Sequence, residues 1–453
     1  MLEQATPVIS WVACSYAAIG RSGGLTVPAL LLVIAYGVVV TTWKVFHVLL
    51  LLYKPRRFFL TRRARRFVDH DGPFVSILLA AKDEEGQIGD CIRSVLNSEY
   101  RDFELIVIDD RSTDRTATDA LAAAAGDPRV KMLRVDECPE GWTGKMNAVR
   151  SGFFQSRGDV ILVIDADSRH SPRALEAALA TQYYNNLDLV SLMPRISHRS
   201  FLSRMVQPLI GAVIFCWKPL PWVNSRKHKH VALGWGGFLL MRRAGLEAIG
   251  GFEAVKDCFA ADIAIVGLFK KKGRRVRLYH APKLVSTTMY ASGAKMIEGW
   301  SRILRITSDH RWPYLLATFL AVWIFGLSAY IMIALGLIEC LRGTMRPLPV
   351  LLGSMGLMHL ACQVSLLARI YRMGGSNPLY AAGHLPAMLF TSFLTTHALF
   401  RCRTSRLAWR GTTYSLTRDG RVACLNDPAR ATERLGFGAS KRENAKAAVL
   451  TGA

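Results

Sequence analysis

Two aspartates stand one residue apart at the end of a run of strand-forming residues. The segment VILVID (160–165) leads directly into the pair Asp165 and Asp167. Two carboxylates this close repel one another unless a cation lies between them. Such a pair can hold one divalent cation through oxygen ligands while a diphosphate completes the coordination. The spacing therefore suggests a metal site, although pairs like this also occur in ordinary solvated turns.

Three further acidic segments could take part in the same chemistry. They are AAKDEE (80–85), DDRSTD (109–114) and FAAD (259–262). The first two also follow expected strands, and parallel strands end at one edge of a sheet, where ligands bind in α/β proteins. We therefore expect the acids of these two segments to gather at that edge with Asp165 and Asp167, whereas FAAD comes much later in the chain. Each also has a structural explanation, because Asp110 can close an Asx turn, Glu84 can favour a helix N-terminus, and Asp262 can be a surface group.

The elements that would position these acids alternate between strand and helix patterns. Apolar runs typical of buried strands occur at 74–81, 103–109, 130–135, 160–165 and 187–193. Helical periodicity follows at 87–98, from Asp114, at 145–156 and from Ser171. Strands that alternate with helices predict right-handed crossovers and a mostly parallel sheet covered on both faces. The expected fold class is therefore α/β, with a Rossmann-like sheet.

The composition places this α/β region beside a membrane. The chain has 453 residues, 51% of them apolar, and its formal net charge is +24. The apolar stretch 27–53 is long enough to cross a bilayer, and seven basic residues follow it within 54–66. Basic residues beside a span mark its cytoplasmic side and attract anionic lipid. The position of the charge therefore favours a membrane, and not nucleic acid, as the partner.

The C-terminal part of the chain is apolar again, in the segments 313–338, 347–367 and 379–400. The first two are expected to span the membrane. The third carries His384, Pro386 and many hydroxyl residues, and we expect it to be re-entrant. Two spans would return the basic tail to the cytoplasm, as the positive-inside rule requires. The segment 201–217, broken by polar residues and a proline, suits a helix in the membrane interface.

The expected organisation is a membrane anchor at 1–53, a basic linker at 54–73, a catalytic α/β domain at 74–310, a transmembrane region at 311–400 and a basic cytoplasmic tail at 401–453. The end of the tail is expected to be disordered. The nine cysteines show no metal-ligand spacing. We expect them to be free thiols in a reducing compartment.

The motifs as a set resemble the family 2 glycosyltransferases with the GT-A fold. The resemblance is carried by AAKDEE, DDRSTDRT, GWTGKMNA (141–148) and DADS, and runs from about Phe74 to about Thr307, half of the chain. With the apolar segments, WGGFLLMRRAGLEAIGGF (235–252) and AWRGTTYS (408–415) are most similar to the ceramide-glucosyltransferase-like and the carotenoid- or hopanoid-glycosyltransferase-like branch. The resemblance therefore implies a membrane-anchored enzyme.

The resemblance also implies a role for each matching residue. The residues that would bind a nucleotide-sugar donor are Glu84, Asp109, Asp110, Lys145 and Asp165. Of these, Glu84 and Asp110 would contact the nucleoside, with Asp109 in support, and Lys145 would lie near the diphosphate. The pair Asp165 and Asp167 would hold Mg²⁺ or Mn²⁺.

Two positions depart from the family pattern. Asp262 matches the second acid of the family's ED or DD pair and would be the general base, but Ala261 replaces the first acid. The QxxRW motif of many members has no clean match in EGWSRILRI (298–306). The residues there that are expected near the acceptor or the diphosphate are Trp300, Arg302 and Arg305. This second departure counts against processive synthesis.

The sequence therefore predicts an inverting glycosyltransferase that moves a sugar from a nucleotide-sugar, by resemblance a UDP-sugar, to a hydroxyl of a membrane lipid. One base and one metal site suit direct displacement with inversion. The expected location is the cell or inner membrane, with several spans and a cytoplasmic catalytic domain. Two alternatives are a processive polysaccharide synthase and a non-catalytic membrane scaffold. The sequence identifies neither the sugar, nor the lipid, nor the oligomeric state.

Overall fold

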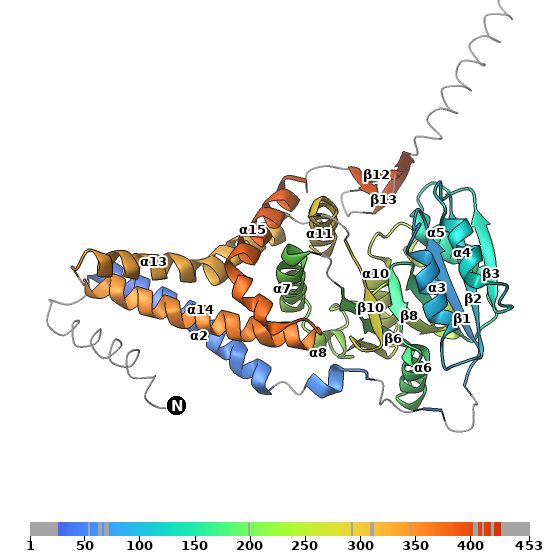
Figure 1. Ribbon diagram of the computed structural model, residues 1–453, viewed down its shortest axis with the longest axis horizontal. Coiled ribbons are helices and arrows are strands. Elements are labelled where there is room, and N and C mark those ends of the chain that lie inside the picture. The colour runs from blue at the N-terminus through green and yellow to red at the C-terminus, as the bar shows by residue number, and fades with distance from the viewer. Residues whose placement is uncertain are drawn as a thin grey trace, which may run out of the picture.

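An α/β region and a bundle of apolar helices make up the computed structural model (Figure 1). The residues it describes are 26–52, 55–61, 66–67, 72–197, 200–290, 293–308, 312–344, 346–401, 406–409, 412–417 and 421–426. The start of the predicted anchor, parts of the linker and the end of the predicted tail lie outside these ranges.

A seven-stranded sheet forms the centre of the α/β region. Its strands are β1 (Val75–Ala81), β2 (Phe103–Asp110), β3 (Val130–Val135), β4 (Val160–Asp165), β6 (Leu189–Met193), β8 (Phe238–Arg242) and β9 (Val276–His280). Their spatial order is β3-β2-β1-β4-β8-β6-β9. Strand β8 is antiparallel to its neighbours β4 and β6, and the other pairs are parallel. The mostly parallel α/β sheet is confirmed, whereas β8 and β9 have no counterpart among the predicted strands.

Helices cover both faces of the sheet. One face packs against α3 (Ile88–Leu96), α4 (Thr116–Ala124) and α6 (Ala174–Tyr184), and the other against α5 (Gly144–Phe154), α9 (Arg243–Ala248) and α10 (Ala261–Lys271). Side chains alternate along a strand, so Ile77 and Leu79 face α3 while Leu78 faces α5. Burying each such side chain contributes about 1.5–3 kcal/mol. The doubly covered sheet therefore fixes the positions of the strand ends.

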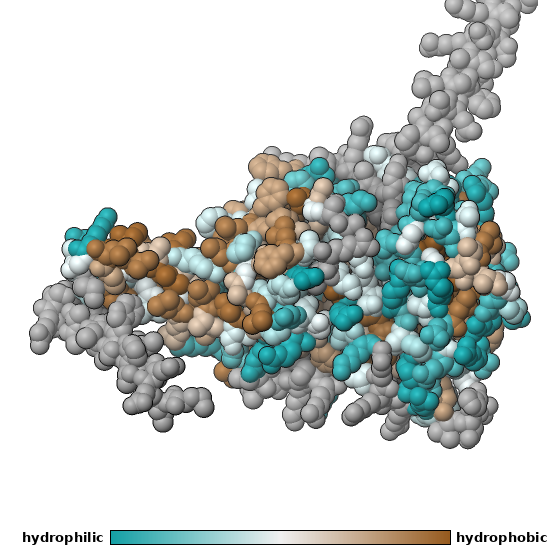
Figure 2. All heavy atoms as spheres, viewed as in Figure 1, coloured by the Kyte–Doolittle hydropathy of each residue, from teal (hydrophilic) through white to brown (hydrophobic). Residues whose placement is uncertain are grey.

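Three helical segments in the described part of the chain are long and apolar enough to cross a membrane, namely Val27–Leu49, Trp312–Leu341 and Pro347–Met373. They belong to α2 (Val27–Leu52), to the continuous series α12 (Trp312–Ala321), η3 (Val322–Leu327) and α13 (Ser328–Leu341), and to α14 (Pro347–Met373). Where α13 meets α14, a Cβ on Gly336 would lie 2.8 Å from the Cα of Gly353. Small residues permit such close packing between membrane helices. Figure 2 shows that this end of the molecule has the hydrophobic surface.

The third predicted C-terminal segment is not among these candidate spans. It forms η4 (Pro378–Gly383) and α15 (His384–Arg401), and α15 packs against α7 (Phe201–Trp217), α11 (Gly293–Thr307) and α12. One face of α15 is buried, whereas Leu389 and Phe393 on the other face are 50% exposed. A re-entrant path for this segment remains a prediction.

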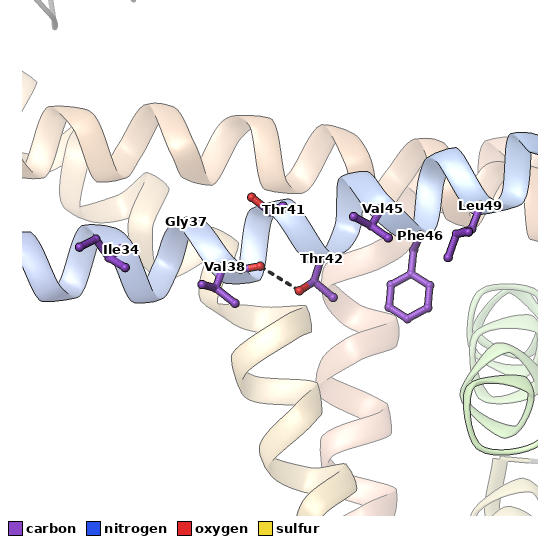
Figure 3. A pocket seen from close by; sticks show the side chains of 8 residues that line it. All are labelled: Ile34, Gly37, Val38, Thr41, Thr42, Val45, Phe46 and Leu49. Atoms are coloured by element: carbon purple, nitrogen blue, oxygen red, sulfur yellow. Dashed lines mark hydrogen bonds between the residues drawn. The ribbon is translucent and has the colours of Figure 1, made fainter.

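A groove runs along one face of α2 (Figure 3). The residues that line it are Ile34, Gly37, Val38, Thr41, Thr42, Val45, Phe46 and Leu49. The Thr42 hydroxyl donates to the carbonyl of Val38 at 2.8 Å, so its hydrogen is already bonded within the helix. None of the lining residues is titratable, so the groove offers no acid or base for catalysis.

Candidate active site

A lysine lies among the carboxylates at the carboxyl-terminal ends of the strands. Lys145, in the first turn of α5, forms an ion pair with Asp165, the last residue of β4. Burial lowers the pKa of this lysine, but the carboxylates of Asp165, Asp262 and Asp167 outweigh that effect, so the pKa is raised. Residues from three distant segments of the chain therefore share one charged cluster. The strand-end position of Asp165 and Asp167 was predicted, and the place of Asp262 beside them was not.

The turn after β4 presents the two aspartates of the predicted metal site. Asp165 and Asp167 are both partly exposed, whereas Ala166 between them is 1% exposed. The Ser168 hydroxyl donates to the carbonyl of Asp165 at 2.6 Å and fixes the turn.

These residues fit a divalent cation that the substrate helps to bind. In the described part of the chain, no group of three or more His, Cys, Asp or Glu side chains could hold a metal by itself. Mg²⁺ in nucleotide sites is commonly held by one or two carboxylates together with substrate phosphates. The donors available from Asp165 and Asp167 match that set, and the ion pair of Asp165 with Lys145 shows that the site attracts positive charge.

Two glycines before β8 leave space above this cluster. A Cβ on Gly236 would lie 3.5 Å from Nζ of Lys145 and 3.7 Å from Oδ2 of Asp262. A Cβ on Gly237 would lie 3.3 Å from Oδ2 of Asp165. Side chains at these positions would crowd the lysine and the carboxylates, so glycine keeps the space beside them open to a substrate group.

Asp262, the predicted base, lies in the first turn of α10. Burial raises the pKa of its carboxyl group, while the backbone amides of Ile263 and Gly236 and the charge of Lys145 act in the opposite direction. A carboxylate with a raised pKa is a better proton acceptor. Ala261 beside it is buried and supplies no second acid. The location therefore suits a single base, and the role itself stays a prediction.

The two acids that end β2 are buried. Asp110 is 4% exposed and pairs with Arg111, with 2.8 Å between the carboxylate and Nε. A Cβ on Gly144 would lie 2.5 Å from Oδ2 of Asp110, so glycine is required where α5 begins. Asp109 is 3% exposed, and its Oδ2 accepts no hydrogen bond within the described residues, although Arg134 lies 3.8 Å away. A nucleoside that contacts Asp110 would therefore share it with Arg111.

The loops after β1 and β2 are bonded to one another. The Asp83 carboxylate accepts from the amide of Thr113 at 3.0 Å, and the amide of Glu84 donates to the Thr116 hydroxyl at 2.8 Å. These bonds hold the first two acidic segments at the same edge of the sheet. The contact of Glu84 with a nucleoside remains a prediction.

The C-terminal tail reaches the same edge, which the sequence analysis did not predict. Its strands β11 (Arg406–Trp409), β12 (Thr412–Leu416) and β13 (Val422–Asn426) form a small sheet beside the α/β region (Figure 1). Tyr414 is 2% exposed, and its hydroxyl accepts from the amide of Gly144 at 3.3 Å. Its ring meets Phe259 edge to face, with centroids 4.9 Å apart. The Thr412 hydroxyl accepts from Lys82 at 3.4 Å.

The tail therefore joins three parts of the site: the end of β1, the start of α5 and the loop before α10. The AWRGTTYS motif (408–415), which contributes to the family resemblance, is the signal in the sequence that could have identified this contact.

The residues predicted near the acceptor or the diphosphate lie on α11. Trp300 is 3% exposed and packs edge to face with Tyr290, with centroids 6.2 Å apart. Burial raises the pKa of Tyr290 to about 12, and the charges of Arg302 and Asp167 also act on this tyrosine. Arg305 is 5% exposed. Arg302 thus shares a neighbour with the predicted metal site, whereas Trp300 belongs to the packed core between the helices.

Parts of the chain are similar to known glycosyltransferases. Residues 76–250 match the family model described as glycosyl transferase family 2. The chain is 27% identical over 211 residues to a probable glycosyltransferase, YdaM, of Bacillus subtilis, covering 46% of this chain and 49% of that one. It is 37% identical over 99 residues to the beta-monoglucosyldiacylglycerol synthase of Nostoc sp., covering 21% of each. The chain thus spans half or less of these relatives.

Among solved structures, the mannosyltransferase PcManGT of Pyrobaculum calidifontis, in complex with GDP-Man and Mn²⁺, has a TM-score of 0.42 at 17% identity, covering 81% of this chain and 97% of that one. A similarity this low supports no inference about the ligands of this chain. The family match contains Lys145, Asp165 and Asp167, and it coincides with most of the mostly parallel sheet. Residues 76–250 are therefore similar in sequence to the glycosyl transferase family 2, and they form most of a mostly parallel α/β sheet.

Proposed function

We propose that this chain is an inverting glycosyltransferase that moves a sugar from a UDP-sugar to a hydroxyl group of a membrane lipid. The observation that carries the proposal is the charged cluster in which Lys145 pairs with Asp165 beside Asp262. A transferase of this kind must bind a diphosphate and must also accept a proton. This cluster offers a cation for the first task and a carboxylate with a raised pKa for the second.

Departure of the nucleoside diphosphate requires positive charge near its phosphates. Lys145 supplies one such charge, and its pair with Asp165 keeps it at the strand edge. Asp165 and Asp167 would hold Mg²⁺ or Mn²⁺, and a metal ion bound there would stabilise the negative charge of the leaving group.

The acceptor hydroxyl must lose a proton as it attacks the anomeric carbon. Asp262 is the proposed base, and the amides of Ile263 and Gly236 hold its carboxylate in place. A double displacement would need a further carboxylate as the nucleophile, and Ala261 supplies none beside the base. A single displacement inverts the configuration at the anomeric carbon.

A lipid acceptor is favoured by the helices between the α/β region and the candidate spans. Helices α7, α11 and α15 pack together there, and Phe201 at the start of α7 is 66% exposed. Tyr290 connects α11 to the charges around Asp167. A hydroxyl at the membrane surface would therefore have a short path to the cluster. One relative is itself named as a beta-monoglucosyldiacylglycerol synthase.

We propose a multi-pass protein of the cell or inner membrane with its catalytic domain in the cytoplasm. The two candidate spans after the α/β region would return the chain to the side from which it left. The bond between Tyr414 and the amide of Gly144 supports the same parity, because it requires the tail and the α/β region to share one side.

A processive polysaccharide synthase is the second candidate function. A pore for a growing chain would require more spans than the three candidates that the described residues contain. The imperfect match to QxxRW at 298–306 also counts against it. We therefore expect one sugar to be added to each acceptor.

The test is sugar transfer by the full chain in nanodiscs that contain lipids of the host cell. A panel of radiolabelled nucleotide-sugars is supplied with Mg²⁺ or Mn²⁺, and label is measured in the organic phase. We expect one UDP-sugar to label a lipid that carries a single sugar residue. A label found only in a water-soluble polymer would identify a synthase. If none of the nucleotide-sugars is either transferred or hydrolysed, the result would favour the scaffold.

Asp159→Asn is the matched control for the catalytic aspartates. Asp159 is exposed and immediately precedes β4, at the opposite end of the strand from Asp165. This variant should retain parental transfer, whereas variants at the strand edge should not.

A further inference from the structure

We propose that the loop 225–230, which follows α8 (Leu220–Val223), is a binding surface for anionic phospholipid headgroups. The loop carries five exposed basic or titratable side chains in succession, namely Arg226, Lys227, His228, Lys229 and His230. None of them belongs to the charged cluster at the strand edge. The inference depends on membrane insertion alone. Headgroup binding at this loop can therefore fail while the proposed sugar transfer stands, and sugar transfer can fail while headgroup binding stands.

The loop lies close to the point where α2 would leave the bilayer. Leu220 and Val223 of α8 share an apolar cluster with Phe58 and with Phe215 of α7. Phe58 ends η1 (Pro55–Phe58), which follows α2 almost directly in the chain. Figure 1 shows α8 beneath α7 and near the end of α2. A surface attached to α8 is therefore near the headgroup region.

The base of the loop is held rigidly. Lys270 of α10 is 5% exposed and donates to the carbonyl oxygens of Val223 at 2.7 Å and Val231 at 2.5 Å. The side chain of Asn224 bonds to both the carbonyl oxygen and the amide of Leu278, at 2.9 and 2.7 Å. Because the two ends are already fixed, binding at the tip costs little further ordering of the backbone.

The chemistry of the loop matches an anionic interface. In the sequence, no Asp or Glu occurs between Asp188 and Glu247. Among the described residues, no carboxylate forms an ion pair with the basic side chains of the loop. Trp222 is 49% exposed and stacks on His228, with centroids 5.0 Å apart and planes 3° from parallel. Tryptophan favours the membrane interface, and each Lys or Arg near an anionic surface strengthens binding about fivefold.

The test compares lipid selectivity of the full chain in nanodiscs of equimolar phosphatidylglycerol and phosphatidylcholine. The ratio of the two lipids that remain bound is measured by native mass spectrometry. We expect the parent to prefer phosphatidylglycerol, and we expect Lys227→Gln/Lys229→Gln to lower that ratio about five- to thirtyfold. Raising the salt concentration should lower the parental ratio by a larger factor than the ratio of the variant, which keeps Arg226 and the basic linker.

The matched control removes the same charge elsewhere. Arg93→Gln/Arg101→Gln alters exposed arginines on α3 and just before β2, whereas α8 packs against β9, at the edge of the sheet away from β2. The control should keep the parental ratio. The proposal is overturned if the lysine variant keeps the parental preference for phosphatidylglycerol, or if the control lowers that preference equally. UDP affinity, measured in parallel, verifies that each variant is folded.

Discussion

Replacing Asp262 by Asn tests which group removes the proton from the acceptor hydroxyl. Asn keeps the size of the side chain and an oxygen that can accept from the amides of Ile263 and Gly236. It removes the basic carboxylate, and Ala261 leaves no neighbouring acid to replace it. The variant should therefore fold normally and fail in proton transfer.

The expected magnitude follows from the loss of a single base. General acid–base groups typically contribute about 10²- to 10⁴-fold to a rate, which corresponds to about 2.7–5.4 kcal/mol of barrier at 1.36 kcal/mol for each factor of ten. Binding of the donor should change little, because Lys145 keeps its ion pair with Asp165 when Asp262 loses its charge. We therefore expect kcat to fall by two to four orders of magnitude, while the affinity for UDP stays within a few-fold.

The assay measures initial rates of sugar transfer in nanodiscs and, separately, UDP affinity by calorimetry. Asp159→Asn, at the other end of β4, serves as the control and should match the parent in both measurements. Normal turnover combined with weakened UDP binding would refute the reasoning. Asp262 would then belong to the donor site, and the base would have to be another residue.

The remaining predictions concern the metal, the tail and the topology. Asp165→Asn and Asp167→Asn should each abolish transfer and make UDP affinity independent of Mg²⁺ or Mn²⁺, whereas full parental activity in excess chelator would exclude the metal role. Tyr414→Phe leaves a buried backbone amide without its acceptor, at a cost of about 1–3 kcal/mol. We therefore expect a lower melting temperature and a higher KM for the donor, and an unchanged KM would confine Tyr414 to a structural role. Cysteines introduced at positions 63 and 406 should both be labelled from the cytoplasmic side, and labelling of position 406 from outside would mean that 379–400 spans fully.

The parts of the fold that the sequence predicted are those in which local pattern and burial agree. The strands β1 and β4 are buried on both faces and are almost wholly apolar in sequence, and β2 is buried throughout and apolar from Leu105 to Ile108. Strand β9 alternates arginine and aromatic residues with Val276 and Leu278, which are its buried positions, within a basic cluster that resembles a solvated loop. Its place in the sheet depends on pairing with β6, a contact that no local pattern contains.

The same distinction applies to the site. Asp165 was expected at the strand edge from its position after β4, and Lys145 near the diphosphate from the family resemblance. Asp262 was expected apart from the metal site, and the structure instead brings its charge together with those of Lys145 and Asp165. Tyr414 was not predicted as a site residue, because its bond to the amide of Gly144 joins positions 270 residues apart in a tail that is otherwise polar and basic. Its aromatic ring is buried by tertiary packing against Phe259, which composition cannot indicate.

Mass spectrometry of membrane lipids tests the central claim most directly. Lipids are compared from cells that lack the gene, cells that carry the parental gene and cells that carry the gene for Asp262→Asn, with expression of both proteins verified. We expect a lipid that is heavier than its precursor by one sugar residue, present with the parental gene and absent from the other two strains. An identical lipid profile in all three strains, or a sugar-modified lipid that persists with Asp262→Asn, would contradict sugar transfer to a lipid at this site.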